Sequence, residues 1–272
     1  MRTVEWLNLI VFSVFFVAAW LRPVTSRSRA LISIAAATGI TLVIAVQFAN
    51  RFLPLHTVSV IRDWLPAPLM LMAYWQAGRF SRRPNARFQN YLQKLDRKWV
   101  GTMLRSMADN PIYRSIFVCL ELAYLSCYAL VPFGLVALYL THMRSHANEY
   151  WLVILLATYP CYLFTSFVPT VPPRKMRTES APSRPGKVRA FNLWIIRQAS
   201  IGLNTFPSAH VTATLGASLV LLRYVSNVGL IFLLVSIGIA VGAVTGRYHY
   251  AADVIVAAVL VIATFTLDVF FF

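Results

Sequence analysis

The sequence predicts an all-α, polytopic membrane bundle of about six to eight transmembrane helices. Of its 272 residues, 58% are hydrophobic and only 12% are charged, whereas a soluble domain has roughly 25% charged residues. Most apolar residues gather in runs near ~20 residues, the length that crosses a bilayer as an α-helix. Lipid offers no hydrogen bonds to the backbone, so each crossing segment is expected to be helical. The runs are 5–21, 30–49, 63–78, 113–140, 150–170, 207–224, 228–246 and 250–272.

Three of these runs need separate comment. The first follows Arg2 and leads to Arg22-Pro23 without a small-residue cleavage site, so we expect a retained span rather than a signal peptide. Run 63–78 is short and contains two prolines, which favours a re-entrant or tilted segment. Pro132 lies inside the long run 113–140 and predicts a kink there.

The longest polar segment, 79–114, mixes basic and apolar residues. Phe88, Leu92, Leu95 and Trp99 recur at steps of three and four residues. This spacing predicts an interfacial amphipathic helix whose basic residues face anionic lipid headgroups. An ordinary solvated basic loop is the alternative interpretation.

The formal net charge of +16 is carried by short loops between apolar runs. With eight spans, most Lys and Arg fall on one side, which the positive-inside rule places in the cytoplasm. We therefore expect a multi-pass protein of a bacterial inner or plasma membrane. Nucleic acid is not an expected partner, because the chain has no soluble basic domain. Cys119, Cys127 and Cys161 all lie in apolar runs and predict neither a disulfide framework nor a zinc site.

His249 and Asp253 form the first candidate catalytic pair. Their separation of four residues places both on one face of a helix. The carboxylate can hold the proton of one ring nitrogen and leave the other nitrogen free as a nucleophile or base. The alternative is a histidine at a helix end with a polar neighbour.

The segment 204–210 precedes another apolar run and resembles a helix start, with Pro207 among Asn, Thr and Ser. Free backbone N–H groups at Ser208 and Ala209, together with the helix dipole, predict a phosphate site. His210 stands at its edge, where it can donate a proton to a leaving oxygen. Helix capping alone would explain Ser and Pro but not the histidine.

A basic loop after run 150–170 supplies the third element. It contains Arg174, Arg177 and Arg184, and a guanidinium group binds phosphate through its planar fork. Membrane topology alone also produces basic loops. Together the three elements fall on one side of the membrane and predict phosphoryl transfer on a lipid substrate.

These motifs resemble those of the type 2 phosphatidic acid phosphatase superfamily. The family's second motif is Pro-Ser-Gly-His, matched by 207–210 with Ala209 in place of Gly. Its third motif, Ser-Arg, five residues, His, three residues, Asp, ends in His249 and Asp253. The motif's arginine falls at Ala243, and Arg247 is a possible substitute. The resemblance covers about residues 113–272.

The first motif, Lys, six residues, Arg-Pro, can be placed in two ways. Arg177, six residues and Arg184-Pro185 fit its spacing with Arg for Lys. Pro-Pro-Arg at 172–174 resembles the branch that includes inositol-phosphorylceramide synthase-like proteins, and we favour Arg174 over the alternative.

The resemblance implies a six-helix phosphatase-like core in a catalytic domain at 113–272, preceded at 1–112 by transmembrane helices and the basic amphipathic segment. It implies that His249 attacks phosphorus to form a phosphohistidine, Asp253 orients it and His210 protonates the leaving group. Metal ions and other cofactors are not implied. The phosphate oxygens would be held by Arg174, Arg247, Arg177, Arg184 and the backbone at Ser208 and Ala209.

These residues are compatible with three functions. The leading one is hydrolysis of a lipid phosphomonoester or pyrophosphate, of the phosphatidic acid or isoprenyl type. The second is a phosphotransferase that moves a phospho-headgroup to an alcohol. The third is a non-enzymatic transporter, since intramembrane His and Asp also form proton relays. A metal site built from His210, His249 and Asp253 is a further alternative.

Overall fold

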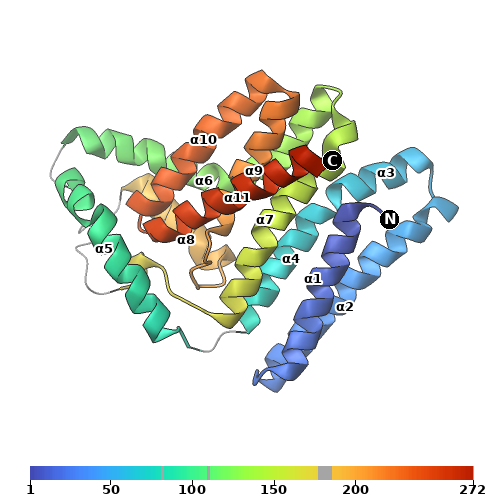
Figure 1. Cartoon of the computed structure of the whole chain (residues 1–272), viewed down its shortest axis with the longest axis horizontal. Helices are drawn as coiled ribbons and strands as arrows, with labels where there is room; N and C mark the ends of the chain where they lie inside the picture. Colours follow the sequence, from blue (N-terminus) through green and yellow to red (C-terminus); the bar gives the residue numbers. More distant parts are fainter. Residues whose placement is uncertain (81–82, 109–110, 177–185, 272) are drawn as a thin grey trace.

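The computed structural model is a bundle of α-helices, and it describes residues 1–80, 83–108, 111–176 and 186–271 (Figure 1). Within these ranges there is no β-strand, only an isolated bridge between Thr170 and Asn204. The all-α prediction is confirmed. The α-helices are α1 (Thr3–Leu21), α2 (Ser26–Phe48), α3 (Leu55–Trp64), α4 (Pro66–Arg79), α5 (Ala86–Ala108), α6 (Pro111–Leu140), α7 (Ala147–Phe167), α8 (Lys187–Ala199), α9 (Ala209–Tyr224), α10 (Ser226–Thr245) and α11 (Ala251–Phe271).

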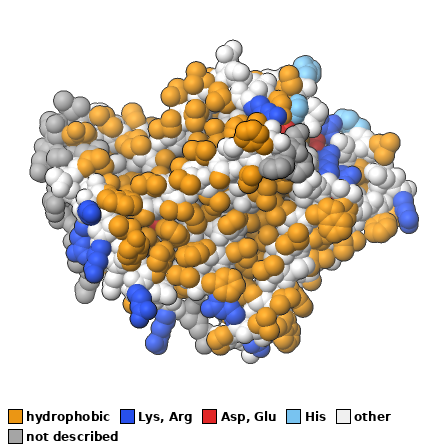
Figure 2. Space-filling view, in the orientation of Figure 1, with side chains coloured by type: hydrophobic (Ala, Val, Ile, Leu, Met, Phe, Trp, Pro, Cys, Tyr) orange, Lys and Arg blue, Asp and Glu red, His pale blue; other side chains and the backbone are white. Residues whose placement is uncertain are grey.

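Six of the helices in the described residues are long and apolar enough to cross a membrane. They are α1, α2, α6, α7, α10 and α11. Their apolar side chains dominate the middle of the surface in Figure 2, while Lys and Arg gather towards its edges. The chain is therefore a multi-pass membrane protein.

Run 63–78 is divided between two helices. α3 ends at Trp64 and α4 begins at Pro66, a residue suited to the first helical position because it has no N–H to lose. α4 then lies along α7. The Trp151 indole donates to the carbonyl of Asp63 at 2.7 Å, and further along the rings of Tyr74 and Tyr162 are 5.6 Å apart. α4 thus runs on through the bundle in the direction of α7 and does not turn back as a re-entrant segment would.

α7 lies at the centre of the bundle, against α1, α4, α9 and α11. Polar bonds occur inside this apolar core: the Tyr159 hydroxyl donates to Asn8 of α1 at 2.5 Å, and the hydroxyls of Thr158 and Thr212 are 3.1 Å apart. One hydrophobic cluster extends from α1 and α2 to α9. The division of the chain at residue 112 stays a prediction.

Two amphipathic helices flank the bundle near the start of α11. The predicted helix within 79–114 is α5, whose Leu92 is buried against Tyr250 and Ala252. Trp99, which we placed on the same face, is 48% exposed. α8 was not predicted, because its sequence has no long apolar run. Two stacked and exposed aromatic residues of α8, Phe191 and Trp194, have ring centroids 5.8 Å apart.

The contact between α6 and α10 depends on a glycine. A Cβ at Gly242 would lie 2.5 Å from the carbonyl oxygen of Leu120. We expect Gly242→Ala to force the helices apart, to cost about 1–3 kcal/mol of stability and to lower the midpoint of thermal unfolding of the purified protein. Gly216→Ala is the matched control, since its Cβ would meet no atom closer than 3.5 Å. Equal midpoints for the two variants would contradict this account.

Candidate active site

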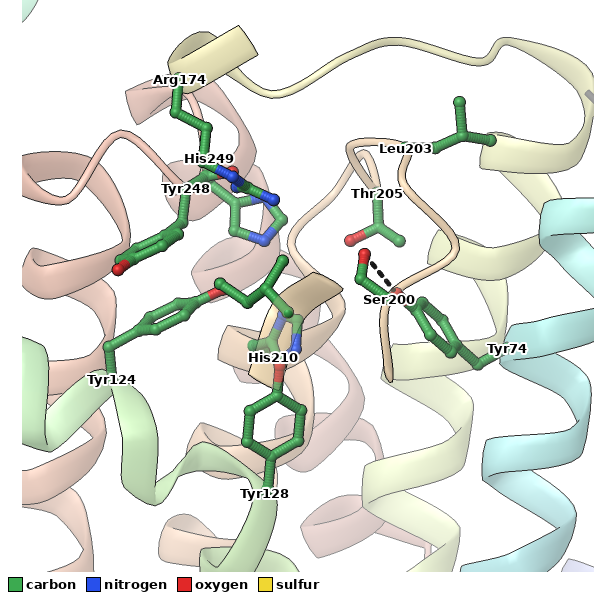
Figure 3. A pocket seen from close by; sticks show the side chains of 11 residues that line it. Tyr74, Tyr124, Tyr128, Arg174, Ser200, Leu203, Thr205, His210, Tyr248 and His249 are labelled. Carbon is green, nitrogen blue, oxygen red and sulfur yellow. Dashed lines mark hydrogen bonds between the residues drawn. The ribbon is translucent and has the colours of Figure 1, made fainter. Parts of the chain in front are cut away.

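The predicted histidines meet in a small cavity near the starts of α9 and α11 (Figure 3). Its volume is about 20 Å³. Its walls come from five parts of the chain: α4, α6, the 3₁₀ turn η3 (Pro173–Lys175), the segment from α8 to α9, and the loop between α10 and α11. The lining residues are Tyr74, Tyr124, Tyr128, Arg174, Ile196, Ser200, Leu203, Thr205, His210, Tyr248 and His249.

His249 and Asp253 form the contact that their spacing predicts. Nδ1 of His249 lies 3.2 Å from Oδ2 of Asp253, which also accepts the N–H of Tyr250 at 2.9 Å. Asp253 is completely buried and His249 is 4% exposed. With Nδ1 bound to the carboxylate, the ring presents Nε2 to the cavity (Figure 3).

The backbone around Ala243 sets the position of His249. The carbonyl of Ala243 accepts the N–H groups of both Tyr248 and His249 at 2.9 Å. The chain reverses through Arg247, whose φ of 59° lies in the left-handed region typical of the residue after a helix. Ala243, which stands where the family motif has arginine, therefore contributes through its main chain.

His210 faces His249 across the cavity. Their ring centroids are 5.7 Å apart with the planes inclined by 63°. Tyr124 and Tyr128 each place a ring 5.7 Å from that of His210. Among the described residues no group hydrogen-bonds Nδ1 of His210, although that atom is buried. The ring is held by packing, and its polar atoms remain available to a bound group.

Arg174 reaches the cavity from η3. Its backbone N–H donates to the carbonyl of Arg247 at 3.1 Å, and its Nη1 donates to the carbonyl of Tyr248 at 3.3 Å. The guanidinium lies 5.3 Å from the centroid of the Tyr248 ring, a cation–π arrangement. Within the described ranges no carboxylate pairs with Arg174. Burial lowers the pKa of its guanidinium group.

The other predicted arginines are placed differently. Arg247 does not line the cavity and forms a short ion pair with Asp96 of α5. Asp96 also accepts the N–H of Ala251 at 3.0 Å, so the pair joins α5 to the start of α11. Arg177 and Arg184 lie outside the described residues. Phosphate binding by these three arginines stays a prediction.

The predicted backbone cradle already has partners within the protein. The N–H of Ser208 donates to the carbonyl of Asp253 at 3.1 Å, and that of Ala209 donates to Oγ1 of Thr205 at 3.2 Å. Ser208 and Ala209 thus join the start of α9 to neighbouring segments. Oγ of Ser208 is buried without a partner in the described part of the chain.

Sequence reasoning missed the tyrosines and the network that holds one of them. The hydroxyl of Tyr248 donates to Glu121 of α6 at 2.6 Å, and its ring stacks on Tyr124 at 4.0 Å. Glu121 also pairs with Arg189 at 2.8 Å and accepts from Asn192 at 2.6 Å, both on α8. A buried acid in an apolar run was the available signal, since such a charge requires partners.

The cavity leaves its nucleophile little contact with bulk water, since His249 is 4% exposed. A volume near 20 Å³ is about that of one water molecule, so a phosphoryl group requires movement of the lining side chains. Leu203 and Ser200 belong to the connection between α8 and α9, which contains Gly202 at a φ of 77°. Among the described residues no group of three His, Cys, Asp or Glu side chains is placed to hold a metal ion.

Burial keeps His249 neutral. Loss of hydration, assisted by the charge of Arg174, lowers the pKa of His249 from 6.5 to about 3. A neutral imidazole retains the lone pair that a nucleophile needs.

Arg174→Gln should raise the pKa of His249, because the positive charge that opposes protonation is removed. Burial remains, so the value should stay below 6.5. NMR titration of ¹⁵N-histidine-labelled protein measures this, with His249→Asn used to identify the signal. Lys175→Gln removes a neighbouring cation and should leave the pKa unchanged. An ordinary pKa for His249 in the wild-type protein would contradict the assignment.

No curated protein and no solved structure matches the chain. The family model described as the PAP2 superfamily matches residues 90–267, from within α5 to near the end of α11. This match includes both histidines, Asp253 and every lining residue of the cavity except Tyr74, and it supports a phosphatase- or phosphotransferase-type function. The chain belongs to the PAP2 superfamily.

Proposed function

We propose that this protein is a lipid phosphate phosphatase that hydrolyses a phosphomonoester or pyrophosphate through a phosphohistidine on His249. The observation that carries the proposal is the position of Arg174, a partly buried cation that faces two histidines and has no carboxylate partner in the described residues. A cation in this setting favours a bound anion, since an unpaired buried charge is costly. A phosphoryl group provides that anion.

His249 is suited to the nucleophilic step. Its Nδ1 is bound to Asp253, so Nε2 supplies the electron pair that forms the N–P bond while the P–O bond to the lipid breaks. The imidazole becomes positively charged, and Asp253 stabilises that charge at Nδ1.

His210 is placed to serve as the general acid. Burial, with the neighbouring His249 and Arg174, lowers its pKa to about 3, and the negative charge of a bound phosphoryl group would raise that pKa towards the protonated form. The two rings face each other with centroids 5.7 Å apart, so movement of the lining side chains would let a phosphorus atom lie about 3 Å from the attacking nitrogen, with the departing oxygen towards His210. His210 donates a proton to the departing oxygen. In the second step it accepts a proton from water, whose oxygen attacks phosphorus and releases His249.

Arg174 and Thr205 line the same cavity as the two histidines. The guanidinium can donate two parallel hydrogen bonds to phosphate oxygens, which carry increasing charge in the transition state. Arg189 and Arg247 are committed to Glu121 and Asp96, so Arg174 is the arginine we assign to the phosphate. The fatty or isoprenyl chain extends from the leaving oxygen.

Phosphate release tests this function directly. Purified protein with EDTA should release inorganic phosphate from phosphatidic acid or an isoprenyl pyrophosphate, and His249→Ala should abolish turnover. His142→Ala, an exposed histidine beyond α6, is the control and should remain active. Headgroup exchange without phosphate release would instead indicate a phosphotransferase, and normal activity of His249→Ala would refute the nucleophile.

The role of His210 predicts a dependence on the leaving group. A good leaving group needs little protonation, so His210→Ala should retain far more activity on an aryl phosphate than on an alkyl phosphate. General acid catalysis is worth about 10²–10⁴-fold, and the loss on the alkyl ester should fall in that range. Steady-state kcat values for both substrates measure the difference. An equal loss on both would assign His210 to another role.

A further inference from the structure

A second cavity lies at the other end of the bundle from the histidines. It has a volume of about 300 Å³ and forms between the start of α1, α3 and the turn that leads into α7. All of its lining residues are polar: Arg2, Ser59, Asp63, Arg144, Ser145 and Asn148. The charged cluster in the upper right of Figure 2 lies over this end of α1, α3 and α7.

Asp63 organises the wall of this cavity. Its side chain is 2% exposed and accepts from Nη1 of Arg2 at 2.6 Å and from Nε of Arg144 at 2.7 Å. The hydroxyl of Tyr139 donates to the same carboxylate at 2.7 Å. The guanidinium groups are therefore fixed in position before any ligand binds, which lowers the entropy cost of binding.

Both arginines keep hydrogen-bond donors for a ligand. In the described residues, the guanidinium of Arg2 donates only through Nη1. Arg144 uses Nε for Asp63 and Nη2 for Ser59 at 2.7 Å. The two side chains are 27% and 26% exposed, so their remaining N–H groups are accessible.

The charge of the cluster is positive. Arg62 pairs with Glu5 at 2.6 Å, whereas Asp63 alone balances two arginines. The cavity also lies beside the first turns of α1 and α7, where the helix dipoles add positive potential. An anion is the complementary ligand.

We propose that this cavity binds a phosphate-bearing anion, either a phospholipid headgroup or free phosphate. Guanidinium groups match phosphate oxygens in geometry, and Ser59, Ser145 and Asn148 add hydroxyl and amide groups. The volume admits a phosphate together with the glycerol of a phosphodiester headgroup. The site is separate from the reaction cavity, which lies at the opposite end of α7, and does not depend on the proposed function.

Ser145 offers a test that leaves the ion pairs of Asp63 intact. It is exposed and takes no part in that network. Ser145→Glu places a competing carboxylate beside the arginines, and Ser145→Gln is its neutral control of equal size. Asn227→Glu adds the same charge at an exposed position at the same end of the bundle, outside the cavity.

Binding can be measured on the full chain in phosphatidylcholine nanodiscs, by the midpoint of thermal unfolding as phosphatidylglycerol is increased. Ser145→Glu should raise the apparent dissociation constant about tenfold or more, because a second negative charge in the site opposes binding of the anion. Ser145→Gln and Asn227→Glu should stay within about twofold of the wild type.

A parallel titration with inorganic phosphate distinguishes the two sources of the anion. Saturation by phosphatidylglycerol alone assigns the site to a lipid headgroup, and saturation by inorganic phosphate assigns it to the free ion. In both cases Ser145→Glu should weaken the response. The proposal is overturned if neither titration saturates in the wild type, or if Ser145→Glu and Ser145→Gln respond alike.

Discussion

The arrangement of the site depends on the buried carboxylate of Asp253. In a protein surrounded by lipid, a buried polar group must find its partners inside the molecule. Asp253 accepts from the ring of His249 and the N–H of Tyr250, and its main-chain carbonyl accepts the N–H of Ser208. One residue thereby connects the first turn of α11 to the start of α9 and orients the imidazole. Replacing its side chain would leave two buried donors, the His249 ring and the N–H of Tyr250, without this acceptor, each at a cost of about 1–3 kcal/mol.

The arginines around the site have different tasks because their partners differ. Arg189 and Arg247 are matched with Glu121 and Asp96, and these pairs attach α8 and α5 to the helices that carry the histidines. Arg174 has a cation–π contact and carbonyl acceptors but no matching carboxylate in the described residues. A guanidinium held in this way keeps its charge available in a partly buried site, where electrostatic attraction to an anion is stronger than in bulk water.

Local features were predictable from the sequence, whereas distant pairings were not. Hydrophobic runs of sufficient length predicted the membrane helices, and a spacing of four residues predicted the contact of His249 with Asp253. The tyrosine lining was missed because an aromatic residue in an apolar run normally packs in the core. Nor does any local pattern pair Arg247 with Asp96, since 151 positions separate them. Run 63–78 was ambiguous because its prolines can start, bend or end a helix.

The hydrogen bond from the Ser208 amide to the Asp253 carbonyl joins two main-chain groups. It therefore does not depend on which side chains stand at these two positions. A side-chain replacement at either residue removes neither the amide nor the carbonyl. Most point mutations at these two positions therefore leave this link between the starts of α9 and α11 in place. Side chains around the histidines, including those of Ala209 and Ala243, can therefore change while this hydrogen bond is kept.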